Sequence, residues 1–170
     1  MRDPVLERYR APALAFTGYL VLQAASAAAL FALKLGDPDG VRAFYLGSTE
    51  RFTVAKSLAG MLEVAVPHLV AIPLVLFAAA HVVGFARALP APGYRALVAA
   101  SFGAALAGIL SGFGVRWVAP ELAWLKIASF AALEAALVAW AGLLGAVFLP
   151  RRAACAAGAA TVAEAGAGTR

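Results

Sequence analysis

The sequence predicts an all-α integral membrane protein whose four transmembrane helices form an antiparallel helical bundle. Hydrophobic residues make up 64% of the 170 residues, whereas Asp, Glu, Lys and Arg together supply only 14%. The mean hydropathy is +0.87. Most of the charged residues lie between four long apolar stretches. A soluble domain of this size exposes far more charge, so the composition identifies a membrane protein.

Each of the four apolar stretches is long enough to cross a bilayer. A helix rising ~1.5 Å per residue needs about 20 residues to span ~30 Å of hydrocarbon. Lipid offers no hydrogen-bond partners to the backbone, and the stretches are too long for barrel strands and lack period-two alternation. The predicted spans are helices at about 13–33, 64–86, 96–115 and 127–149.

The first span follows a short N-terminal segment, residues 1–12, which we expect on the cytoplasmic side. Basic residues before an apolar run, followed by Ala25-Ser26-Ala27, are typical of a cleaved signal peptide. The apolar run nevertheless continues to Leu33 without a polar region before the cleavage motif. This continuity favours an uncleaved anchor helix.

An external loop, residues 34–63, separates the first and second spans. A turn cluster at 36–40 ends the first helix, and the segment 44–52 mixes aromatic and charged residues as chains at lipid headgroups do. We expect this segment to cover the outer face of the bundle. Proline-containing turns join the later spans, and such short turns make sequential helices antiparallel neighbours.

The distribution of Lys and Arg predicts the orientation and the partners. Arginines precede the first span, lie between the second and third, and follow the fourth, so these flanks are predicted to be cytoplasmic. Both termini, including a flexible tail at 151–170 with the single Cys155, would then face the cytoplasm from the inner (cytoplasmic) membrane. The positive charge is spread over helix ends rather than gathered in a stripe, which argues against nucleic-acid binding.

Small residues on the third span predict a close helix contact. Ala104, Gly108 and Gly112 recur every four residues and therefore share one helix face. This face could pack inside the chain or against a second copy, and Gly142 and Gly145 on the fourth span could be its counterpart. The expected partners are the lipid bilayer and either further copies of the chain or a larger membrane complex.

The candidate site residues are His68, His81 and Glu134. The two histidines are the only ones in the chain, and both lie in the second span, thirteen residues apart. That spacing corresponds to about 19.5 Å along a helix and about 140° around it, so they cannot share one metal or one haem. Glu134 lies near the middle of the fourth span, where a carboxylate costs about 2.5–3.5 kcal/mol. The predicted topology brings His68 and Glu134 to similar depths and so allows them to pair.

Histidines at this spacing on one membrane helix resemble the haem-ligating pairs of cytochrome b-type subunits. The resemblance covers only residues 67–83, and this chain has no opposing histidines on another helix. It implies haem b, with His68 and His81 as iron ligands. The missing ligands would then come from a second copy or a partner subunit, or the haem would be five-coordinate.

Three functions remain open from the sequence. The first is a small multi-pass membrane subunit with a redox-linked site for haem b or a quinone, since a buried imidazole and carboxylate can exchange protons with a quinone. The second is a structural or assembly accessory of a membrane complex. The third is a component of proton or small-solute transport. The chain shows no motif for phosphate binding, hydrolysis or nucleotide chemistry, so we expect no autonomous enzymatic activity.

Overall fold

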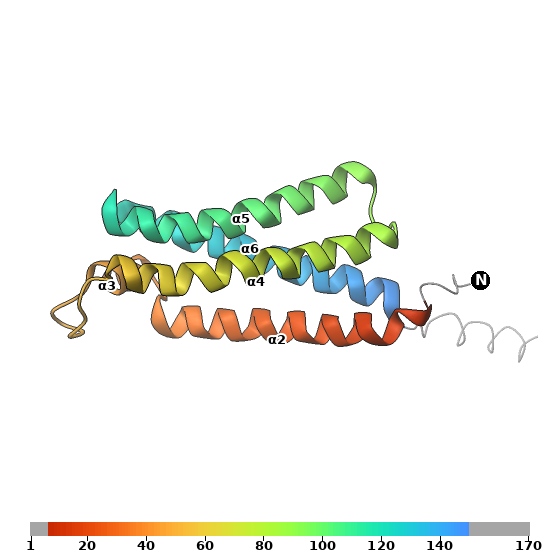
Figure 1. Cartoon of the computed structure of the whole chain (residues 1–170), viewed down its shortest axis with the longest axis horizontal. Helices are drawn as coiled ribbons and strands as arrows, with labels where there is room; N and C mark the ends of the chain where they lie inside the picture. Colours follow the sequence, from red (N-terminus) through yellow and green to blue (C-terminus); the bar gives the residue numbers. More distant parts are fainter. Residues whose placement is uncertain (1–6, 150–170) are drawn as a thin grey trace, which may run out of the picture.

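The computed structural model describes residues 7–149, and its four long helices run side by side with alternating directions (Figure 1). Each of the four is long and apolar enough to cross a membrane, which confirms the predicted fold class. The helices are α2 (Arg10–Lys34), α3 (Pro38–Leu46), α4 (Leu58–Phe85), α5 (Ala91–Trp117), η1 (Pro120–Leu122) and α6 (Ala123–Phe148).

Helix α6 holds the bundle together, because it packs against α5, α2, α4 and α3. Helix α2 packs mainly on α6 and lies along one side of the bundle (Figure 1). Helices α4 and α5 are direct neighbours, as the short turn between them predicts. The α2–α6 seam is continuous with the core, since Leu20 and Ala24 of α2 belong to the same buried cluster as residues of α4, α5 and α6.

The main core is centred on Trp140, whose side chain is fully buried. Its indole N–H donates a hydrogen bond to Ser101 Oγ at 3.0 Å, and Ser101 Oγ donates to Leu97 O at 2.6 Å. The Tyr94 ring meets the indole edge-on at a centroid distance of 6.3 Å, and its hydroxyl donates to Ala80 O at 3.1 Å. These contacts connect α4, α5 and α6 with their polar groups satisfied.

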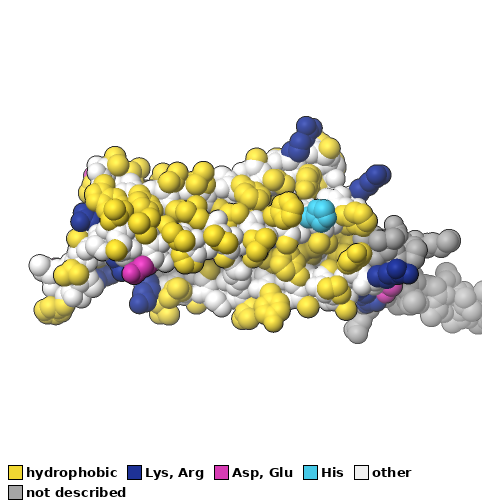
Figure 2. Space-filling view, in the orientation of Figure 1, with side chains coloured by type: hydrophobic (Ala, Val, Ile, Leu, Met, Phe, Trp, Pro, Cys, Tyr) yellow, Lys and Arg dark blue, Asp and Glu magenta, His cyan; other side chains and the backbone are white. Residues whose placement is uncertain are grey.

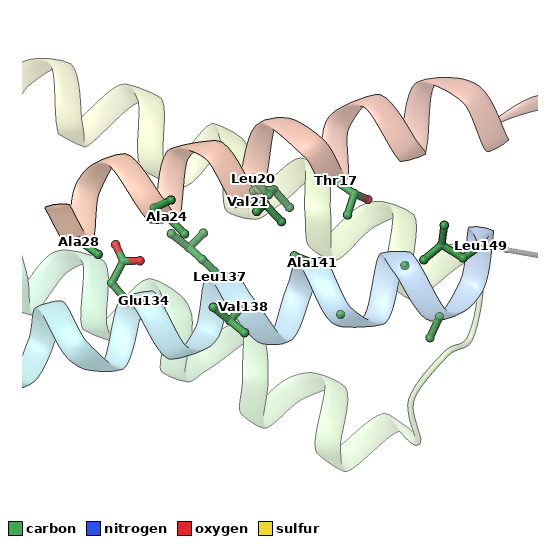
Figure 3. A pocket seen from close by; sticks show the side chains of 14 residues that line it. Thr17, Leu20, Val21, Ala24, Ala28, Glu134, Leu137, Val138, Ala141 and Leu149 are labelled. Carbon is green, nitrogen blue, oxygen red and sulfur yellow. The ribbon is translucent and has the colours of Figure 1, made fainter.

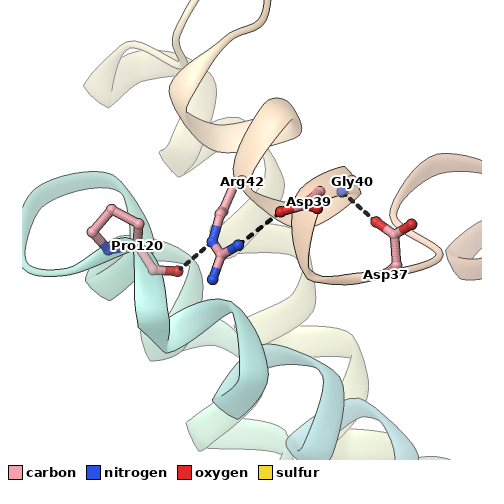
Figure 4. Close-up of polar contacts among 5 residues, drawn as sticks. All are labelled: Asp37, Asp39, Gly40, Arg42 and Pro120. Atoms are coloured by element: carbon pink, nitrogen blue, oxygen red, sulfur yellow. Dashed lines mark hydrogen bonds and ion pairs between the residues drawn. The ribbon is translucent and has the colours of Figure 1, made fainter.

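The predicted external loop contains a helix, α3, that the sequence analysis did not predict. The Asp37 side chain accepts a hydrogen bond from Gly40 N at 2.6 Å and so caps the start of α3. Arg42 Nη1 pairs with Asp39 at 2.7 Å, while Arg42 Nε donates to Pro120 O at 3.3 Å (Figure 4). Helix α3 is therefore attached to the turn between α5 and α6.

Helix α4 extends beyond the predicted second span, 64–86, at its N-terminal end. Helix α4 begins at Leu58 rather than at residue 64, because the Ser57 hydroxyl accepts a hydrogen bond from Gly60 N at 3.2 Å. Between α3 and α4 the chain forms a tight turn, in which Ser48 and Thr53 exchange backbone hydrogen bonds of 2.9 and 3.0 Å. The predicted external segment 34–63 thus contains α3 and the first turns of α4.

The small-residue face of α5 packs within the chain. A Cβ added to Gly108 would lie 3.5 Å from Ser129 Oγ of α6, and one added to Gly112 would lie 2.8 Å from the Tyr45 hydroxyl of α3. Gly142 and Gly145 are not the counterpart of this face, because they line the space between α6 and α2. Of the two partners that the sequence allowed for this face, its own chain or a second copy, the structure shows its own chain: Gly108 contacts α6 and Gly112 contacts α3.

Lys and Arg side chains gather at the ends of the bundle, with hydrophobic side chains between them (Figure 2). This pattern is typical of a membrane-spanning bundle. The predicted tail 151–170 with Cys155, and the first six residues of the predicted segment 1–12, lie outside the described residues. The inside–outside orientation stays a prediction.

Candidate functional site

The two histidines lie on exposed positions of α4. His68 Nδ1 is 2.6 Å from Val64 O, and because a carbonyl only accepts, this nitrogen carries the proton. The His81 ring stacks against Phe77 at a centroid distance of 5.9 Å. Figure 2 shows a histidine at the surface among hydrophobic side chains. Both side chains are therefore exposed, and His68 also borders a small cavity beneath α3.

Glu134 lies on α6 and points toward α2, beside Ala24 and Ala28 (Figure 3). It is half-buried. The pair that the sequence allowed between Glu134 and His68 does not form, since His68 lines a different cavity. The three predicted site residues are thus distributed over three places.

A groove of about 970 Å³ runs between α2 and α6, and we call it the α2–α6 groove. It exists because small side chains face each other across this seam. On α2 and α6 these are Ala24, Ala25, Ala28, Ala141, Gly142, Gly145 and Ala146. The Thr17 hydroxyl, which also lines the groove, already donates to Ala13 O at 2.8 Å. Glu134 therefore supplies the groove's ionisable group.

The Glu134 carboxylate makes no hydrogen bond or ion pair with any residue in the range 7–149. Four residues earlier on the same face of α6, Phe130 stacks on Phe31 of α2 at a centroid distance of 3.9 Å and an interplanar angle of 8°. This stacked pair joins α2 to α6 one turn away from Glu134. The carboxylate thus lies at one end of an apolar groove, free to receive a ligand's polar group.

A second cavity of about 60 Å³ lies under α3, and we call it the lysine cavity. Its polar side chains are Tyr45, Lys56, His68 and Lys126. Ligand pockets typically measure about 300–1,000 Å³, so this cavity is too small for a haem. The cavity could not be predicted from the sequence, because its lining residues come from α3, the following turn, α4, α5 and α6.

Tyr45 in α3 is buried, and burial raises the pKa of its hydroxyl from 10.0 to about 12. The unfolded chain then binds fewer protons than the folded protein between these two values, so stability falls as the pH rises through them. We expect a loss of up to about 3 kcal/mol in the free energy of unfolding from this group. Denaturation from pH 9 to pH 12 measures it, with Tyr45→Phe as the control. An equal slope in Tyr45→Phe would contradict the assignment.

No group of three or more His, Cys, Asp or Glu side chains within the described part of the chain is arranged to hold a metal ion. His68 and His81 therefore remain single candidate ligands, each needing partners from elsewhere to complete a metal or haem site.

Four apolar helices of spanning length define a small multi-pass membrane protein. The chain belongs to the Aq_1264_TM family, a transmembrane helical domain that matches residues 36–154. The match takes in α3 to α6 and begins after α2, so the α2–α6 groove lies between the family domain and the preceding helix. Comparison with curated proteins and with solved structures finds no match for this chain.

Proposed function

We propose that this protein is a small membrane subunit that binds a lipid-soluble quinone in the α2–α6 groove. The observation that carries the proposal is a mid-span carboxylate, Glu134, without a described partner at one end of an apolar groove of about 970 Å³. An ionisable group at this depth is costly, which favours a functional role. The volume suits a ligand of quinone size.

Glu134 can serve both redox states of such a ligand. In its protonated form the carboxyl group donates a hydrogen bond to a quinone carbonyl, and in its ionised form it accepts one from a quinol hydroxyl. From Glu134 the groove follows α6 to Leu149, a distance of about 22 Å at ~1.5 Å per residue. Its apolar walls would accommodate a prenyl tail.

The geometry favours a quinone over the other predicted ligand, haem b. His68 borders a cavity too small for a haem and His81 is exposed on α4, so a haem at either histidine would need room or ligands from a second chain. The proton path suggested by the sequence is also less favoured, because Glu134 and His68 line separate cavities. A structural or assembly role is the main alternative, in which lipid tails or a partner helix fill the groove.

Glu134→Leu is expected to weaken quinone binding about tenfold, because it removes one hydrogen bond worth roughly 1.4 kcal/mol. Glu134→Gln keeps a hydrogen-bonding group and should retain most of the affinity, but without its dependence on pH. Titration of the purified protein in phosphatidylcholine nanodiscs with decylubiquinone measures both effects. Equal affinity in the wild type and Glu134→Leu would reject Glu134 as the binding group.

A groove-filling substitution provides the matched control for this experiment. Gly142 lies in the groove, whereas Gly103 lies on α5 outside it, and a Cβ added to either meets no atom within 4 Å. Gly142→Leu should therefore abolish decylubiquinone binding, and Gly103→Leu should leave it unchanged. A b-type band in the reduced spectrum that disappears in His68→Ala or His81→Ala would instead support haem.

A further inference from the structure

The lysine cavity carries positive charge without a nearby carboxylate. Lys56 and Lys126 both line it, whereas none of its lining residues is Asp or Glu. Within residues 7–149, neither lysine forms an ion pair, since the described pairs join Arg10 to Glu7 and Arg42 to Asp39. Ammonium groups that are partly removed from water normally have a counter-ion. The missing counter-ion indicates an anionic ligand.

The two lysines are fixed by contacts that leave donors available. Lys126 Nζ donates one hydrogen bond, to Gly108 O at 2.6 Å, and an ammonium group has two further N–H groups. Lys56 Nζ lies 4.7 Å from the centroid of the Phe44 ring. The Lys56 backbone is held on both sides, because its N–H donates to Tyr45 O at 3.0 Å and its carbonyl accepts from Arg116 Nε at 2.8 Å.

Two further polar groups of the cavity lack a partner. The Tyr45 hydroxyl makes no hydrogen bond to a described residue, and the residue as a whole is only 6% exposed. His68 uses Nδ1 for the Val64 carbonyl, which leaves its Nε2 unpaired among the described residues. The cavity therefore offers an anion two ammonium groups and a hydroxyl donor, contributed by several elements. His68 Nε2 is an acceptor in this tautomer and does not donate to an anion.

From these contacts we infer that the lysine cavity binds a phosphate group. Its volume of about 60 Å³ exceeds that of one water, which occupies ~30 Å³ in the liquid, and suits a single oxyanion. Lys126 lies in the first turn of α6, and Lys56 just precedes α4. Both lysines therefore lie near one end of the spans, the end that a headgroup phosphate approaches. An anionic lipid or free inorganic phosphate can supply this group.

The inference is tested with the full chain purified in dodecyl maltoside, a detergent without phosphate. One titration uses sodium phosphate against sodium chloride at equal ionic strength, and the other uses dihexanoyl phosphatidylglycerol against dihexanoylglycerol. Binding is measured by calorimetry. We expect the phosphate-bearing ligands to bind and the matched controls not to bind. Binding of the lipid alone would identify a headgroup, and binding of both would show that free phosphate also enters.

Charge-removing substitutions locate the site. Lys56→Gln and Lys126→Gln should each weaken binding roughly ten- to a hundredfold, as expected for loss of a charged hydrogen bond. Lys34→Gln is the matched control, because Lys34 is exposed and does not line the cavity. If Lys126→Gln fails to fold, Lys56→Gln alone still tests the site. The Lys56 side chain donates no hydrogen bond to a described residue, so its loss should not unfold the protein. The inference is overturned if no phosphate ligand binds, or if Lys56→Gln binds as well as Lys34→Gln.

Discussion

Replacing Trp140 by alanine is expected to lower the free energy of unfolding by about 3–5 kcal/mol, the range seen when large aromatic core residues are truncated. The indole is fully buried among α4, α5 and α6. In lipid the loss comes mainly from packing, because an unfolded helix also keeps its apolar side chains out of water. The substitution also removes the indole N–H that donates to Ser101 Oγ.

Two variants separate packing from hydrogen bonding at this position. Trp140→Phe retains most of the ring and should cost less than Trp140→Ala, since a hydrogen bond in a membrane bundle averages about 0.6 kcal/mol. Trp124, on the same helix, is 63% exposed, and Trp124→Ala should change stability by less than about 0.5 kcal/mol. Unfolding by SDS titration in mixed micelles, followed by circular dichroism, compares the three. Equal losses for Trp124→Ala and Trp140→Ala would show that Trp140 is not a core residue.

The long helices could be predicted from the sequence because length and hydropathy are local properties. A run of about 20 apolar residues has few alternatives to a spanning helix. Helix ends are harder to predict than spans, because a cap such as the Ser57 hydroxyl begins α4 before the apolar span 64–86. A single capping serine changes the hydropathy averaged over a window very little, so the average does not locate the helix end.

Helix α3 could not be predicted in the same way. It has nine residues, too few for a stable isolated helix, and its position depends on distant residues. Arg42 reaches the Pro120 carbonyl, and Tyr45 fills the space beside Gly112. Only the small-residue spacing on α5 was visible in the sequence, and it did not reveal which element would cover it.

In the candidate sites, too, local features could be predicted from the sequence, whereas contacts between distant residues could not. Glu134 stood out because a carboxylate is rare inside a span, but its facing helix, α2, could not be deduced from residue spacing. The expected pairing with His68 rested on depth alone, and depth does not determine which way a side chain points around a helix. Lys56 and Lys126 are seventy residues apart and belong to no local motif, so the lysine cavity appears only in three dimensions.

Substituting leucine for Gly112 is expected to cost about 3 kcal/mol, the upper end of the usual range for overpacking. A Cβ at this position would lie 2.8 Å from the Tyr45 hydroxyl and 2.9 Å from its Cζ, so the buried Tyr45 ring must move. Gly103→Leu on the same helix is the matched control, because a Cβ there meets no atom within 4 Å. The free energy of unfolding of the two variants, measured side by side, should differ by most of this amount.

Because Tyr45 also lines the lysine cavity, Gly112→Leu should weaken phosphate binding together with stability. A second substitution distinguishes a local clash from a general defect of α5. If Tyr45 is the obstacle, Tyr45→Ala should restore much of the stability lost in Gly112→Leu, since residues in direct contact have non-additive effects. Phosphate binding should not return in the double variant, because the hydroxyl donor is gone. If the double variant instead loses the sum of the two single losses in free energy of unfolding, glycine at 112 is required for a contact other than the one with Tyr45 of α3.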